Sequence, residues 1–204
     1  MNDIPDYAAL RAHMGQVSAL AERKVLPRLD GHCRAFIALS PFLVIATADR
    51  DGRVDASPRG DPPGFVRVVD DGTLLLPDRP GNNRVDSFAN VVDSPGVGLL
   101  FFVPGIEETL RVNGRAHLVT DEAALADSAV NGRAPKTGLL VAVEEVFFHC
   151  AKALKRSRLW DGTAQVERSS FPSLGRVLSD QMRDAITVED AEERIAVGYR
   201  DRLY

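Results

Sequence analysis

The sequence is poor in cysteine, and its two cysteines, Cys33 and Cys150, are far apart and show no C-x-x-C spacing. This usage is unlike a disulfide framework and favours a protein of the reducing cytoplasm. The histidines show no metal-ligand spacing, and no G-x-S-x-G or paired-carboxylate motif stands out, so we expect neither a metal site nor a hydrolase centre. Nothing resembles G-x-G-x-x-G, so no motif indicates a dinucleotide-binding fold.

Long apolar runs and an excess of one charge are also missing. No apolar stretch reaches about 18 residues, and the N-terminal segment lacks a basic region followed by an apolar core, so we expect a soluble cytoplasmic protein without a membrane partner. The net charge is −4 and both signs are interspersed, which leaves no electrostatic footprint for nucleic acid. Any anion site must therefore be local.

The length of 204 residues is enough for one domain whose core needs neither disulfides nor metal. We expect a single domain over 1–204, with helices in 1–40, a β-rich barrel in 42–160 and helices again in 171–204. Apolar residues at helical spacing predict the two N-terminal helices over 7–24 and 28–40.

Hairpin signals recur through the middle of the chain. The turns Asp51-Gly52, Asp71-Gly72 and Pro104-Gly105 each separate two β-rich runs, and a further run ends at His149, which gives at least six strands. Only short helices near 84–92 and 121–126 interrupt them. Hairpin-linked strands favour an antiparallel barrel over a doubly wound sheet, in which a helix would follow each strand. We therefore predict a mainly β fold with α-helical ends.

A cluster of cations and amides lies between the predicted strand 74–76 and the short helix that comes after it. Asn82 and Asn83 can cap that helix, whose free N–H groups and dipole favour an anion. Arg79 and Arg84 would supply compensating charge. The sequence thus predicts a phosphate site, with an ordinary helix cap beside surface arginines as the open alternative.

A second loop places Arg59 directly after a predicted strand. Gly60 would let the backbone approach a ligand closely, and Pro62 and Pro63 would stiffen the rest of the loop. An ordinary connection between hairpins is the alternative. The equivalent position of this loop and the Asn82-Asn83 loop at strand ends favours a shared ligand.

A third cluster packs Lys152, Lys155, Arg156 and Arg158 beside Trp160, which is the only tryptophan in the chain. Such a segment can clamp a phosphate or stack its indole on an aromatic ring. The alternative is a solvated basic turn with a partly buried tryptophan.

Several motifs together resemble the flavin-binding split-barrel family typified by pyridoxamine 5′-phosphate oxidase. They are SPRGD at 57–61, PDRPGNNRVDSF at 77–88, ETLRVNGRA at 108–116 and HCAKALKRSRLW at 149–160. The resemblance runs from about 42 to 160 and is closest to an FMN-binding branch of the family. It implies an antiparallel split β-barrel, a homodimer with FMN at the subunit interface, and an FMN-dependent oxidoreductase of an unidentified small molecule.

The resemblance also implies which residues contact FMN. Arg59 would replace the family's lysine near the flavin ring edge or its phosphate. Asn82, Asn83 and Arg84 would stand where the family uses a serine and two basic residues for the phosphate. Asp78 falls at a threonine position.

Further cofactor contacts are implied outside the phosphate loop. Thr109 falls where the family places a glutamine near the flavin, on the strand that continues through Arg111. Partner-subunit contacts are expected from four residues of the C-terminal basic segment: Lys152, Arg156, Ser157 and Trp160. No residue is assigned as catalytic.

Two departures limit the resemblance. The family's vitamin-specific pattern Arg-Leu-His-Asp-Arg is absent, so pyridoxamine 5′-phosphate is not the expected substrate. The phosphate loop has one cation fewer than the typical oxidase, which would either weaken FMN binding or leave the phosphate to Arg79. Three alternatives stay open: a split barrel that uses deazaflavin or haem, a non-catalytic flavin-binding or sensor protein, and a structural dimer with an empty groove.

Overall fold

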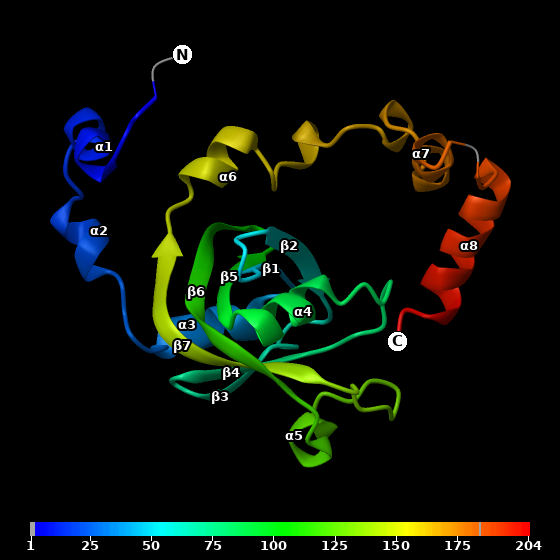
Figure 1. The fold of residues 1–204 in the computed structure, drawn as a ribbon, viewed down its shortest axis with the longest axis horizontal. Coiled ribbons are helices and arrows are strands. Elements are labelled where there is room, and N and C mark those ends of the chain that lie inside the picture. Colours follow the sequence, from blue (N-terminus) through cyan, green and yellow to red (C-terminus); the bar gives the residue numbers. More distant parts are fainter. Residues whose placement is uncertain (1–2, 184) are drawn as a thin grey trace.

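A seven-stranded antiparallel sheet forms the centre of the computed structural model, which describes residues 3–183 and 185–204 (Figure 1). The strands are β1 (Phe42–Ala48), β2 (Val54–Gly60), β3 (Arg67–Asp70), β4 (Thr73–Pro77), β5 (Gly96–Val103), β6 (Ile106–Val119) and β7 (Gly138–His149). They follow the order β2-β1-β5-β6-β7-β4-β3, so that β2 and β3 are the two edges of a curved sheet. The prediction of an antiparallel split barrel with six or more strands is confirmed.

Alternation along the strands fills the barrel interior. Leu43 and Ile45 on β1, Leu99 and Phe101 on β5, and Leu110 on β6 are almost completely buried, and on β1 and β5 an outward residue separates the two buried ones. Side chains two residues apart share one face of a strand, so one apolar set fills one core. This period makes the strands readable from sequence.

The two longest strands bend sharply at one glycine. The pairing of β6 with β7 changes register between Asn113 and Gly114, where a β-bulge increases the local twist. A Cβ atom on Gly114 would collide with the carbonyl oxygen of Ala142. Glycine is therefore required where β6 crosses β7, and the bend helps to curl the sheet into a barrel.

Two helices pack directly on the barrel. Helix α3 (Gly31–Leu39) buries Cys33, Phe36 and Ile37 in the core, and Asp30 caps it by accepting from the Cys33 N–H at 2.8 Å. Burial raises the pKa of the Cys33 thiol to about 11, so this cysteine stays protonated and inert. Helix α4 (Asp86–Asp93) lies against β1, β2 and β6. The small helix α5 (Glu122–Ala126) precedes β7.

The remaining helices lie outside the barrel (Figure 1). They are α1 (Tyr7–Met14), α2 (Ala19–Arg23), α6 (Lys152–Ser157), α7 (Leu174–Gln181) and α8 (Val188–Asp201), with 3-10 turns at Gly162–Ala164 and Arg168–Ser170. The expected helix over 7–24 is thus two helices, because Gly15 takes a φ of 79° that ends α1 and Ser18 caps α2.

Helices α7 and α8 pack on each other and, with the residues that flank them, form a C-terminal arm, 171–204, that arches away from the barrel. Leu26 pairs with Val146 on β7 and fastens the N-terminal helices to the sheet. Over the described ranges, no helix is both long and apolar enough to cross a membrane.

Candidate functional site

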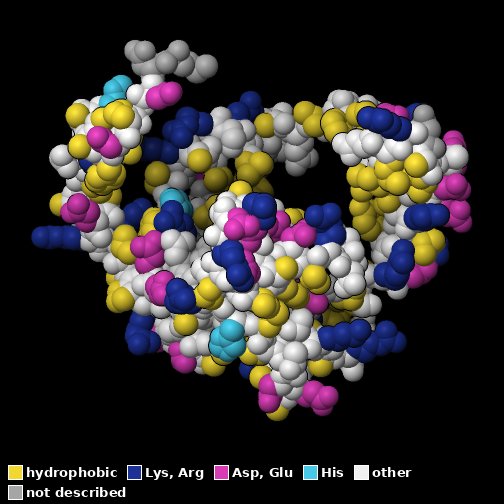
Figure 2. All heavy atoms as spheres, in the orientation of Figure 1, with side chains coloured by type: hydrophobic (Ala, Val, Ile, Leu, Met, Phe, Trp, Pro, Cys, Tyr) yellow, Lys and Arg dark blue, Asp and Glu magenta, His cyan; other side chains and the backbone are white. Residues whose placement is uncertain are grey.

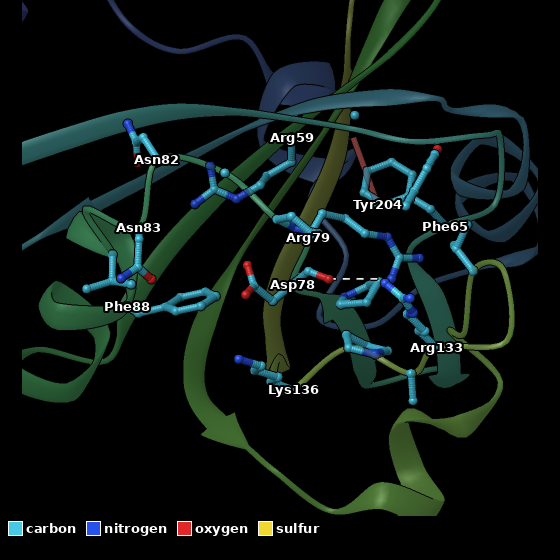
Figure 3. A pocket seen from close by; sticks show the side chains of 18 of the residues that line it. Arg59, Phe65, Asp78, Arg79, Asn82, Asn83, Phe88, Arg133, Lys136 and Tyr204 are labelled. Carbon is cyan, nitrogen blue, oxygen red and sulfur yellow. Dashed lines mark hydrogen bonds between the residues drawn. The ribbon is translucent and has the colours of Figure 1, made fainter. Parts of the chain in front are cut away.

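A cavity of about 640 Å³ opens where β2 ends, beside the loop after β4 and the loop that precedes β7 (Figure 3). Its volume lies within the range of small-molecule sites. Five of the residues predicted from the sequence line it: Arg59, Asp78, Arg79, Asn82 and Asn83. The two loops singled out from sequence therefore meet at one cavity.

Arg59 lies on β2 itself, so the expectation that it belongs to a loop after the strand is wrong. Alternate residues of β2 face α4, and Ser87 of α4 links two of them. The Ser87 hydroxyl donates to Asp55 Oδ2 at 2.6 Å, and Arg59 Nη2 donates to Ser87 Oγ at 3.1 Å. This chain of hydrogen bonds holds the Arg59 guanidinium in place. Figure 3 shows Arg59 at the cavity wall.

The charge of Arg59 has no ion-pair partner within the part of the chain that the structure describes. Burial lowers the pKa of Arg59, although the carboxylates of Asp78 and Asp55 partly offset that effect. An arginine remains charged at neutral pH even when desolvated. The cavity therefore contains a partly desolvated cation that an anionic ligand would stabilise.

Asp78 brings the opposite charge into the same cavity. Burial raises the pKa of the Asp78 carboxyl, and the Arg79 N–H and the cations of Arg59 and Arg79 only partly counter this. A half-buried carboxylate is a hydrogen-bond acceptor that water satisfies incompletely. The site thus combines one cation and one carboxylate, neither of which forms an ion pair with another described residue.

Arg79 lines the cavity, but its guanidinium is turned toward Asp61. Arg79 Nε forms an ion pair with Asp61 Oδ2, and Nη1 donates to the Ser128 carbonyl at 2.9 Å. The Asp61 side chain is 1% exposed, so this pair is almost dry. Arg79 therefore joins three segments of the cavity wall and has little charge left for a phosphate.

The loop after Arg79 does not cap a helix with its asparagines, contrary to the expectation. Helix α4 begins at Asp86, and its cap residue Val85 has a φ of 54° and makes no side-chain capping bond. Asn82 Oδ1 instead accepts from the Arg84 N–H at 3.0 Å, and Asn83 has a φ of 58°. A left-handed valine is strained, and such strain tends to occur at ligand-binding loops.

Comparison with protein-family models identifies the family of this chain. A family model described as pyridoxamine 5′-phosphate oxidase matches residues 29–150, which is more than half of the chain. The chain belongs to the pyridoxamine 5′-phosphate oxidase family. Comparison with curated proteins gave no match.

Solved structures with a similar fold include three bacterial proteins. HupZ of Group A Streptococcus is 20% identical, with 59% of this chain and 93% of that chain covered and a TM-score of 0.48. An FMN-binding protein of Syntrophomonas wolfei is 13% identical, with 57% and 83% covered and a TM-score of 0.47. General Stress Protein 26 of Bacillus anthracis is 14% identical, with 57% and 93% covered and a TM-score of 0.43.

Not every residue implied by resemblance to the pyridoxamine 5′-phosphate oxidase family lies at the cavity. Arg84 is exposed, pairs with Asp86 at 2.7 Å and does not line it. Thr109 and Arg111 lie on β6, where Arg111 stacks 4.9 Å from the Phe147 ring centroid and bonds Glu145. Neither Thr109 nor Arg111 lines the cavity that contains Arg59.

The basic segment at α6 also lies apart from the cavity in this family member. Lys152, Arg156 and Ser157 are exposed on α6, and Trp160 Nε1 donates to the Ile106 carbonyl at 2.9 Å. The indole is therefore fixed against the start of β6. The structure of one chain does not bring these four residues to Arg59.

Three polar side chains that were not predicted from the sequence also line the cavity. Arg133 and Lys136 come from the loop between α5 and β7, and Tyr204 comes from the C-terminal arm (Figure 3). The two cations around Pro135, just before a strand, are a weak signal that the sequence does contain. Tyr204 has no local signal, because its place at the cavity depends on how the arm folds back.

Proposed function

We propose that this member of the pyridoxamine 5′-phosphate oxidase family is an FMN-dependent oxidoreductase acting on a small molecule. One observation carries the proposal: the partly buried Arg59, anchored by Ser87 and without an ion-pair partner among the described residues, stands at a cavity of about 640 Å³. A desolvated cation of this kind is stabilised by an anion such as a flavin phosphate. Membership of the family supports a flavin over an unrelated anion.

The residues present suit a phosphorylated flavin. Arg59 would hold the phosphate together with the amide N–H groups of Asn82 and Asn83, because Asn82 Oδ1 is already used by Arg84. Lys136 would add a second cation from the opposite loop. Asp78 would accept from an N–H group of the ligand and not from its phosphate, since two anions would repel each other.

Bound FMN would supply two-electron redox chemistry, in which the small-molecule substrate loses a hydride and a second substrate or oxygen takes up the two electrons. The residues of this chain would bind and orient the flavin and would exclude water from it. The fixed charge of Arg59 would stabilise negative charge on the ligand without reorganising, because Ser87 already holds it. Phe65 and Phe88 line the cavity with apolar surface and would keep water from the ring.

We also propose that the protein is a homodimer, because the segments before and after the barrel both expose large apolar side chains. Leu20 on α2 is 79% exposed, Val166 is 79% exposed and Tyr199 on α8 is 68% exposed. Figure 2 shows hydrophobic side chains gathered on the inner side of the C-terminal arm. Exposed apolar surface of this extent is typical of protein interfaces. The mass in solution, measured by light scattering, should be that of two chains.

The α6 segment would then contribute to the cofactor site of the partner. Lys152 and Arg156 carry no ion pair among the described residues, so their charges are available to a second chain. Trp160 and Ser157 lie on the same segment. This contribution is expected only in the dimer.

The test is an absorbance spectrum after incubation with FMN and desalting, with mass spectrometry of any chromophore released on denaturation. Retained bands near ~370 and ~450 nm, together with released FMN, are expected of a flavoprotein. A colourless protein would contradict the proposal, and a deazaflavin or haem spectrum would replace FMN with that group. Bound FMN that no electron donor reduces would favour a flavin-binding sensor over an enzyme.

A further inference from the structure

The C-terminal arm returns to the barrel at the candidate site. Tyr204 lines the cavity (Figure 3). Its hydroxyl donates to Asp61 Oδ1 at 2.7 Å. In Figure 1 the arm arches away from the barrel through α7 and comes back along α8. A segment far from the barrel in sequence therefore supplies part of the cavity wall.

The acceptor of this hydrogen bond is rigid. Asp61 is almost fully buried, and its second carboxylate oxygen is held by Arg79, which in turn donates to the Ser128 carbonyl. A phenol that donates to an ionised carboxylate makes a charge-assisted bond. This bond raises the pKa of Tyr204, because it stabilises the protonated phenol.

The end of the arm is held by little else. Ala191 is the buried residue that α8 contributes among the described residues, and it lies in the first turns of that helix. Near the end, Tyr199 is 68% exposed and Leu203 is 60% exposed. Segments with few buried apolar contacts open at low free energy. The end of the arm therefore combines weak packing with one hydrogen bond to a rigidly held acceptor.

We propose that the end of the C-terminal arm, residues 196–204, is a strap that closes one side of the cavity with Tyr204 as its latch, so that a ligand enters and leaves when the Tyr204–Asp61 hydrogen bond opens. The choice of FMN as the ligand rests on the proposed function, whereas the latch itself rests on the contacts of this chain. Opening of the arm would then limit the rate of ligand exchange, while Arg59 stays bound to Ser87.

The first experiment compares Tyr204→Phe with native protein by stopped-flow flavin fluorescence. The variant keeps the ring and removes only the donor, so the rates of FMN association and release should both rise, by about three- to tenfold, while Kd changes less. Glu193→Gln, at an exposed polar position on α8 of the same arm, is the control and should leave both rates unchanged. A rise in the release rate alone would make Tyr204 a ligand contact and overturn the strap.

A second measurement needs no flavin. Amide hydrogen exchange over 196–204 should be faster in ligand-free Tyr204→Phe than in the native protein or in Glu193→Gln, because opening no longer breaks the bond to Asp61. Unchanged exchange would overturn the latch. If no protein binds FMN, the proposed function fails, and the exchange experiment still decides whether Tyr204 secures the arm.

Discussion

Arg59 at the cavity differs from two cations of the α6 segment, Lys155 and Arg158, in burial and in pairing. Arg59 is partly buried, is held by the neutral Ser87 hydroxyl, and has no ion pair within the described residues. Lys155 and Arg158 are exposed, and each forms an ion pair. Lys155 pairs with Glu107, and Arg158 pairs with Asp161. Exposed pairs contribute little, whereas a desolvated charge without a partner is costly until a ligand supplies one. Burial and pairing, more than the number of cations, therefore distinguish a binding site.

The largest expected effect comes from Arg59. Replacing Arg59 by Ala removes the unpaired cation and should weaken FMN binding by about 1.5–3 kcal/mol, or roughly 10- to 150-fold, as for a hydrogen bond to a charged group. Arg158→Ala is the matched change in the other region and should alter affinity by less than about twofold, since Arg158 serves Asp161 and Thr163. Flavin fluorescence titration measures both. Equal losses would abolish the distinction between the two regions.

A smaller effect is expected at the residue that anchors Arg59. Ser87 is 1% exposed and bonds both Asp55 and Arg59, so Ser87→Ala leaves buried polar groups short of a partner. The free energy of unfolding should fall by about 1–2 kcal/mol, and FMN should bind more weakly because the guanidinium is free to move. Urea unfolding measures the first. Ser170→Ala removes an exposed hydroxyl that bonds the Glu167 carbonyl and should change stability by less than about 0.5 kcal/mol.

The barrel was predictable because its signals are local. Alternating apolar residues gave the strands, and Asp-Gly and Pro-Gly pairs gave the turns that join β1 to β2, β3 to β4 and β5 to β6. The break at Gly15 was missed because apolar spacing continues across it, while the backbone there takes a positive φ. Local pattern fixes which elements form, and backbone conformation at single residues sets where they end.

The site was predictable in part. Arg59, Asn82 and Asn83 were placed at one cavity by motif and loop position, and the structure brings them there. Arg79 was expected to face a phosphate but faces Asp61, because an ion pair across 18 residues of sequence leaves no local trace. Arg84 was expected beside it but pairs with Asp86 at the surface. Pairing partners are decided by the fold, so residue type alone does not reveal which charges stay free.

A third substitution, Arg156→Ala, tests whether the α6 segment contacts the cofactor of a partner chain. Arg156 is exposed and has no ion pair among the described residues, so its charge is available. Arg156→Ala should weaken FMN binding by about two- to fivefold, less than Arg59→Ala, because an exposed cation is screened by water and salt. The loss should shrink at high salt. An affinity unchanged at low salt would remove α6 from the site.

The smallest expected effect is on thermal stability, and it has opposite signs at Asp78 in the cavity and at Asp161 beside the α6 segment. Burial raises the pKa of Asp78, so the stability linked to this group is complete below its ordinary pKa of 3.8 and is lost as pH rises through the raised value. Asp78→Asn should therefore melt above the native protein at pH 7, and its advantage should disappear toward pH 4.

Hydrogen bonds from Thr163 and Arg158 lower the pKa of Asp161, so its contribution is present above 3.8 and is lost as pH falls through the lowered value. Asp161→Asn should accordingly melt below the native protein at pH 7. Calorimetry of both variants at pH 7 and pH 4 compares them directly, and shifts of the same sign would show that burial does not separate the regions. A more stable Asp78→Asn that also binds FMN less well would indicate that the carboxylate is retained for the ligand at the expense of the fold.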